Sequence, residues 1–94
     1  MKVICVFLQE FIKMAGAHKI AVELGEGATV RDLVEKLDRE VVPGIKEKLL
    51  EGDQVKWPVE IAVNGRRIEF LQGLDTRLRE GDQVILSPRA LFVL

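Results

Sequence analysis

The 94-residue chain contains one cysteine, one histidine and no apolar run long enough to cross a membrane. The single cysteine, Cys5, excludes a framework of disulfides within the chain. A transmembrane helix requires about 20 apolar residues, and the opening stretch "MKVICVFLQEF" lacks both the long apolar region and the small-residue cleavage site of a signal peptide. We therefore expect a cytoplasmic protein that does not bind a membrane.

An excess of charge of either sign is also absent, since 14 basic residues face 15 acidic ones and the formal net charge is -1. The sequence therefore shows neither the basic surface of a nucleic-acid-binding protein nor an acidic tail. A chain of this length can close one modest hydrophobic core but not two. We expect one domain over residues 1–94 that does not bind nucleic acid.

Residues that carry catalysis or hold metals are equally scarce. His18 stands alone, without a cysteine or second histidine to complete a metal site. Cys5 lies in an apolar stretch, which favours a buried, inert thiol over a sulfur-transfer relay. No pair of catalytic carboxylates and no nucleophile with its base emerges. The sequence thus predicts no enzyme activity, no metal site and no cofactor.

The sequence does contain a clear series of strand patterns. "KVICVFLQ" and "QVILS" are apolar on both alternating faces, and the first is predicted to be a strand covered on both sides. "HKIAVEL" alternates as a half-exposed strand does, antiparallel to the first. A strand is predicted from Val59 to Val63, and the dipeptide "NG" that follows it is a strong hairpin signal, with "RRIEF" as the return strand.

One long helix follows the second strand, in "GEGATVRDLVEKLDRE". Thr29 can cap its first turn, and Asp32, three residues later, completes a capping box. The apolar stripe of this helix is predicted to consist of Val30, Leu33, Val34 and Leu37. Ion pairs between residues four apart are predicted on its other face, from Asp32 to Lys36 and from Glu35 to Arg39.

A shorter helix is predicted from Pro43 to Glu51, because proline suits a first helical turn and Gly52 can end it. Together the elements predict an α+β fold with a mixed sheet of about five strands packed on one main helix plus a short helix. The first and last strands are expected side by side and parallel at the centre. This is the ubiquitin-like β-grasp arrangement.

Two segments, "GEGATVRDLVEKL" and "VNGRRIEFLQGLDTRLREGDQVIL", resemble the MoaD/ThiS sulfur-carrier family and are closest to the small subunit of molybdopterin synthase. The resemblance implies a carrier whose C-terminal Gly-Gly is adenylated with ATP, converted to a thiocarboxylate and delivered into a partner enzyme. Glycine lets such a tail thread a narrow channel. Here the expected Gly-Gly positions hold Phe92 and Val93, and the last glycine is Gly81.

The partner-binding residues are therefore predicted at the end of the chain. Ser87 stands where relatives commonly place a partner-facing aromatic residue, and Arg66 is expected near the tail end of the sheet, where relatives meet acidic partner surfaces. Apolar side chains left in water are disfavoured, so the tail either anchors a partner or folds back on its own sheet. This predicted tail site consists of Arg89, Ala90, Leu91, Phe92, Val93 and Leu94.

Two functions follow from the resemblance. The first is a noncovalent binding module related to sulfur transfer and to molybdenum or tungsten cofactor biosynthesis. The alternative is an active sulfur carrier of the molybdopterin synthase small-subunit type, with a thiocarboxylate at its C-terminus. The expected partner is an adenylating enzyme, a synthase large subunit, a cofactor-dependent oxidoreductase or a second copy of the chain. Trp57, beside Pro58, is expected to cover the edge of the core rather than to contact a partner.

Overall fold

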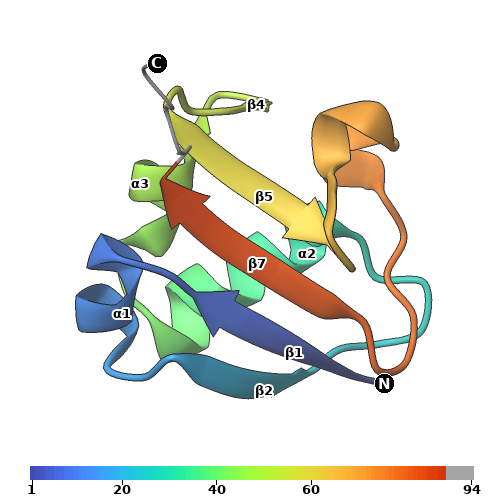
Figure 1. Cartoon of the computed structure of the whole chain (residues 1–94). Coiled ribbons are helices and arrows are strands. Elements are labelled where there is room, and N and C mark those ends of the chain that lie inside the picture. The colour runs from blue at the N-terminus through green and yellow to red at the C-terminus, as the bar shows by residue number, and fades with distance from the viewer. Residues whose placement is uncertain (89–94) are drawn as a thin grey trace.

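A five-stranded mixed sheet forms the centre of the protein, and its strands are connected as in the ubiquitin-like β-grasp fold (Figure 1). The computed structural model describes residues 1–88. The predicted fold class is confirmed, whereas the single domain over residues 1–94 stays a prediction. The strands of the sheet are β1 (Lys2–Phe7), β2 (Lys19–Glu23), β5 (Val59–Val63), β6 (Arg66–Arg67) and β7 (Gln83–Pro88).

The order of the strands is β2-β1-β7-β5-β6. β1 and β7 lie side by side and are parallel, as predicted, while the other pairs are antiparallel. A parallel pair needs a long connection, and here nearly the whole chain connects the two strands. The first and the last strand along the chain, β1 and β7, are therefore neighbours inside the sheet.

Helices cover one side of this sheet, with α2 (Val30–Lys36) and α3 (Ile45–Leu49) behind it in the view of Figure 1. A separate two-stranded sheet follows α3 and is made of β3 (Leu50–Glu51) and β4 (Gln54–Val55). The α-helices are α1 (Glu10–Ala15), α2 (Val30–Lys36) and α3 (Ile45–Leu49). A π-helical turn (Leu37–Val41) continues α2, and two 3-10 helices, Ile68–Phe70 and Gly73–Asp75, precede β7.

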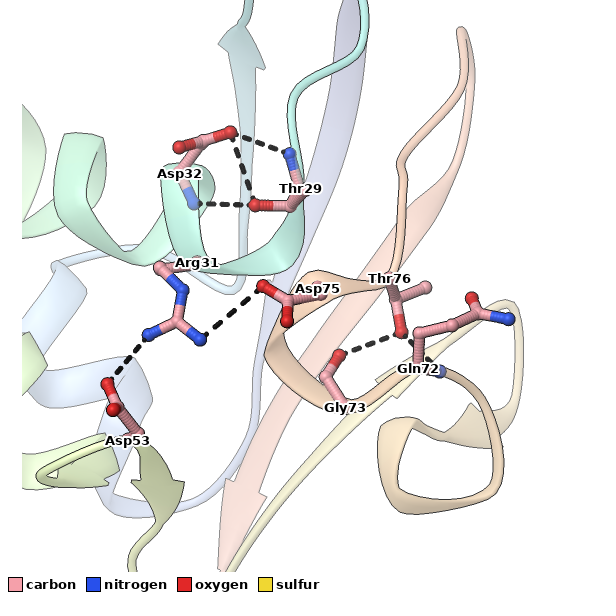
Figure 2. Close-up of polar contacts among 8 residues, drawn as sticks. All are labelled: Thr29, Arg31, Asp32, Asp53, Gln72, Gly73, Asp75 and Thr76. Carbon is pink, nitrogen blue, oxygen red and sulfur yellow. Dashed lines mark hydrogen bonds and ion pairs between the residues drawn. The ribbon is translucent and has the colours of Figure 1, made fainter.

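The predicted capping box starts α2 (Figure 2). The backbone amide of Asp32 donates to the Thr29 hydroxyl at 3.3 Å, and the Thr29 amide donates to the Asp32 carboxylate at 2.9 Å. Two amides that the helix itself leaves without partners are thus satisfied. The four residues of the predicted apolar stripe are fully buried against the sheet: Val30, Leu33, Val34 and Leu37.

Replacement of Thr29 by alanine is expected to lower the free energy of unfolding by about 0.5–2 kcal/mol, because the Asp32 amide loses its acceptor. Thr29→Ser keeps the hydroxyl and should stay close to the original protein. Urea unfolding followed by circular dichroism measures both variants. Equal stability of the alanine and serine variants would mean that the cap contributes nothing.

The predicted ion pairs along α2 are wrong. Lys36 donates to the carbonyl of Glu23, and Glu35 pairs with Lys46 of α3. Arg39 pairs instead with its neighbour Glu40. For Glu35 and Arg39 the cause is the π-helical turn after Lys36, whose wider i to i+5 spacing moves Arg39 away from the position one α-turn beyond Glu35. The Asp32 carboxylate is instead bonded to Thr29 in the capping box.

Four further predictions need correction. The connector after β1 contains a helix, α1, of which only Phe11 is fully buried and which ends at Gly16 in the left-handed conformation. The short helix spans only Ile45–Leu49, because the next two residues pair as β3. The return strand after the hairpin is only Arg66–Arg67, and a 3-10 helix follows it. Finally, β1 is covered by helices on one side only (Figure 1).

Candidate partner-binding surface

The motif "GLDT" (residues 73–76) forms polar contacts with α2 and within its own loop (Figure 2). The guanidinium group of Arg31 on α2 contacts Asp75 at 3.4 Å and Asp53, in the turn between β3 and β4, at 3.0 Å. Thr76 is buried, and its hydroxyl donates to the Gly73 carbonyl at 2.7 Å and accepts from the Gln72 amide at 3.0 Å. Arg31 therefore connects α2 both to this motif and to the turn of the small sheet.

The "NG" hairpin and the "EGD" turn are likewise tied to each other. The Asn64 amide group donates to the Asp82 carboxylate at 2.8 Å and accepts from the Gln83 backbone at 2.9 Å. Asp82 also accepts from the Arg79 amide at 2.8 Å. These three turn motifs of the family resemblance thus shape the scaffold.

One row of side chains crosses the sheet on the side away from the helices. Val6 pairs with Lys19 on one side and with Ile85 on the other. Ile85 in turn pairs with Ala62, and Ala62 with Arg67. Since paired residues point to the same side of a sheet, these five residues form a continuous row with an apolar centre and a cation at each end. We call the side of the sheet that carries this row the open sheet face.

The neighbouring rows enlarge the apolar centre. Ile4 lies two residues before Val6 on β1 and is half-buried, so alternation places it on the open sheet face. At the β6 edge, the guanidinium group of Arg67 stacks over the ring of Phe70 at 4.9 Å from its centroid. The Phe70 side chain is 71% exposed. Val6 and Ala62 are only 6% exposed, so Ile4 and Ile85 make up most of the apolar surface that a partner could reach. An apolar patch with a cationic, aromatic edge is typical of a protein-binding surface.

Of the residues that the sequence analysis assigns to the site, only two lie within the described part of the chain. Ser87 is half-buried and lies two residues after Ile85, hence on the open sheet face. Arg66 does not belong to this face. It pairs with Val63, whose side chain is buried on the opposite side, and lies near the start of β7 rather than its end. The other six, residues 89–94, lie outside the described residues.

Apart from Ser87, the sequence analysis selected none of the residues of this surface, neither the apolar ones nor Arg67, Phe70 and Lys19. A signal for Arg67 was present, because a two-residue "NG" turn pairs Val63 with Arg66 and so places Arg67 opposite Ala62. The positions of Lys19 and Phe70 depend on pairings and contacts between distant segments.

Cys5 is fully buried on the helix side of β1, as expected for a structural thiol. Burial raises the pKa of its thiol to about 12. A thiol that stays protonated at neutral pH is a poor nucleophile. His18 is exposed and immediately precedes β2.

The raised pKa of Cys5 has a consequence for stability at high pH. The folded protein keeps the thiol proton up to about pH 12, whereas the unfolded chain loses it above about pH 9. The contribution of the protonated Cys5 thiol to the free energy of unfolding is therefore complete below pH 9. It is lost as the pH rises from about 9 to about 12, by at most about 1.4 kcal/mol per pH unit. Unfolding free energies at increasing pH should fall more steeply for the original protein than for Cys5→Ala. Parallel curves for the two proteins would contradict the assignment.

The described residues offer little else that could act as a site. Within residues 1–88 no group of three or more histidine, cysteine, aspartate or glutamate side chains is placed to hold a metal ion. No helix in this part of the chain has the length and apolar character needed to span a membrane. The open sheet face is thus the strongest candidate surface.

Comparison with known proteins gives consistent matches over most of the chain. The model of the ThiS family matches residues 6–88. The "Small archaeal modifier protein 3" of Haloferax volcanii is 33% identical over 82 residues, which are 87% of this chain and 88% of that protein. The "Putative sulfur carrier protein" of Archaeoglobus fulgidus is 36% identical over 64 residues, which are 67% of this chain and 72% of that protein.

Among solved structures, the "Putative molybdopterin converting factor, subunit 1" of Pyrococcus furiosus is similar, with a TM-score of 0.77 and 32% identity. The match covers 96% of this chain and 99% of that one. The names of these relatives describe modifiers, carriers and a subunit of a larger factor. They agree with the predicted resemblance and with the prediction that the chain is not itself an enzyme.

Proposed function

The chain belongs to the ThiS family of small ubiquitin-like sulfur carriers and modifiers, and we propose that within this family it acts as a noncovalent binding module in the cytoplasm. It docks on a protein partner of sulfur transfer or of molybdenum or tungsten cofactor biosynthesis. The proposed partner is an adenylating enzyme, a synthase large subunit or a cofactor-dependent oxidoreductase. The name of the Pyrococcus relative, a subunit of a converting factor, supports a role within a protein assembly.

The observation that carries the proposal is the contrast between the scaffold and the tail. The family match extends from residue 6 to residue 88, whereas the six residues that follow read "RALFVL" and contain no glycine. Phe92 and Val93 occupy the positions where the sulfur-carrier resemblance implies Gly-Gly. A channel that fits bare backbone resists bulky side chains, and overpacking of a close-packed site costs about 1–3 kcal/mol or more.

The open sheet face supplies the surface for docking. Its apolar centre, Val6, Ile85 and Ala62, lies on three adjacent strands and is therefore rigid. Lys19 and Arg67 at the two ends of the row favour a partner with acidic groups around an apolar patch. Such an interface needs no covalent chemistry from the chain.

The test of this proposal is a mass measurement. The chain is incubated with an adenylating enzyme of the family, ATP and a sulfur donor, and the intact protein is then weighed. A sulfur carrier that ends in Gly-Gly, treated in parallel, is the positive control. We expect no change in mass for this chain, and the exchange of one oxygen for sulfur would overturn the proposal.

An active sulfur carrier is the second candidate function, and the name of the Archaeoglobus relative favours it. In that case the chain would be activated as a thiocarboxylate despite its bulky tail. The same mass measurement separates the two functions, since only the carrier gains sulfur.

A further inference from the structure

The strand β2 forms one border of the five-stranded sheet, the lower border in the view of Figure 1. It comes first in the strand order, and within residues 1–88 no strand pairs with its outer side. The strand at the opposite border, β6, has only two residues, whereas β2 has five, "KIAVE". An unpaired strand edge is a template for pairing with a further strand. β2 offers its whole length for such pairing.

The register with β1 decides which backbone groups of β2 face outward. Backbone hydrogen bonds join the two strands at both ends of the ladder, from the Leu24 amide to the Met1 carbonyl and from the Phe7 amide to the His18 carbonyl. Hydrogen-bonded and non-hydrogen-bonded pairs alternate in an antiparallel ladder. Lys19, Ala21 and Glu23 therefore direct their backbone N–H and C=O groups away from β1. We call these outward groups the outer edge of β2.

The outer edge of β2 is accessible in its middle. Ala21 is exposed, and its side chain is too small to shield its own backbone groups. At one end, Lys36 of α2 donates to the Glu23 carbonyl, which agrees with the outward direction of this group. A carbonyl oxygen has two lone pairs and can accept a second hydrogen bond. A further strand can thus bond along the full length of the edge.

We propose that β2 pairs with β2 of a second copy of the chain, antiparallel and centred on Ala21. In this register Lys19 of each copy lies opposite Glu23 of the other, on the open sheet face. Opposite charges on directly paired residues stabilise a sheet. On the helix side, Ile20 of each copy lies opposite Val22 of the other, so the half-buried Ile20 gains an apolar contact. The sequence "KIAVE" is therefore complementary to itself under a two-fold rotation.

Other alignments of the two strands are less favourable. A shift by two residues leaves one charge of each copy opposite Ala21 and the other charge outside the pairing, and a shift by one removes the match of outward backbone groups. Parallel pairing in register would set Lys19 beside Lys19. The Glu23 carboxylate lies 3.7 Å from the Met1 ammonium group, and its side chain is still 67% exposed, so it can contact a second cation.

The proposed dimer goes beyond the docking function of the single chain. Its sheet has ten strands, five from each copy, and the two open sheet faces lie on the same side of it. A partner that is itself a dimer would then contact both faces and gain from avidity. Five residues per copy are far fewer than the roughly 20–30 per side of a stable interface, so we expect a weak dimer that forms at high concentration.

Sedimentation of the full chain tests the proposal, over a dilution series that reaches about 1 mM. We expect the average mass to rise from that of the monomer toward that of the dimer. Lys19→Glu sets like charges opposite each other at both ends of the pairing and should raise the dissociation constant about tenfold or more. The double variant Lys19→Glu, Glu23→Lys exchanges the two charges and should restore dimerisation.

Lys13→Glu is the matched control, because it changes the net charge by the same amount at an exposed position of α1. It should leave dimerisation unchanged, and circular dichroism verifies the fold of every variant. A strand of another protein is the alternative occupant of the edge, and it would leave the isolated chain monomeric. A monomer at every concentration, or equal weakening by Lys13→Glu and Lys19→Glu, would overturn the proposal.

A nuclear Overhauser experiment identifies the strand that pairs. The α-protons of non-hydrogen-bonded pairs lie closest across an antiparallel ladder. In an equal mixture of labelled and unlabelled chains we therefore expect an intermolecular contact between the α-protons of Ile20 and Val22. A dimer without this contact would place the interface elsewhere and overturn the proposal. The chain is used without partner, ATP or sulfur donor, so the outcome is independent of the mass measurement that tests the proposed function.

Discussion

Replacement of Leu33 by alanine is expected to lower the free energy of unfolding by about 2–5 kcal/mol. Leu33 is fully buried in the middle of α2, on the side that packs against the sheet. The truncation removes apolar contacts and leaves a cavity that the rigid sheet cannot fill. Because small domains are stable by only about 5–15 kcal/mol, this single change removes a large share of the total.

Glu35→Ala on the opposite side of α2 is the matched control. Its carboxylate pairs with Lys46 at a half-exposed position, and such pairs typically contribute about 1 kcal/mol or less. Urea unfolding of both variants gives the comparison. If Leu33→Ala lowered the free energy of unfolding by less than about 1 kcal/mol, the packing of α2 against the sheet would not be the main stabilising contact of the fold.

The second large effect is expected at the open sheet face. Ile85→Glu should weaken binding of the partner by about 30-fold or more, the effect of losing a hot-spot side chain that contributes about 2 kcal/mol. Ile85 lies at the centre of the row, between Val6 and Ala62. A carboxylate at this position would have to be buried in the interface without a partner.

The fold should tolerate this substitution, because Ile85 is only half-buried in the free chain. Ile12→Glu is the control, since it places the same charge at an exposed isoleucine of α1, outside the strands that form the open sheet face. Calorimetric titration of the partner with each variant measures the effect. Equal weakening by both substitutions, or by neither, would place the interface elsewhere.

Local sequence patterns were sufficient for most of the fold. The buried stripe of α2, its capping box and the bounds of β5 depend on consecutive residues, and all three appear in the structure as expected. Parallel pairing of β1 with β7 followed from their shared apolar character. Helix α1 was missed because its six residues bury only one side chain completely and leave no stripe to recognise.

The candidate surface was harder to predict than the fold. The row from Lys19 to Arg67 exists only because five strands align in one register, and the alignment of Val6 with Ile85 joins residues from opposite ends of the chain. The sequence analysis named Arg66, whereas the open sheet face carries Arg67, and in a strand a shift of one residue moves a side chain to the other face. The two-residue hairpin turn already indicates which of the two arginines lies opposite Ala62.

The central claim, that the chain acts without covalent activation, is tested most directly by pyrophosphate release. Titration of an adenylating enzyme of the family with the chain in the presence of ATP and a pyrophosphate assay measures adenylation itself. The account predicts no pyrophosphate above the level of the enzyme alone, while a carrier with a C-terminal Gly-Gly gives a stoichiometric burst in the same assay. A stoichiometric burst with this chain would contradict the account.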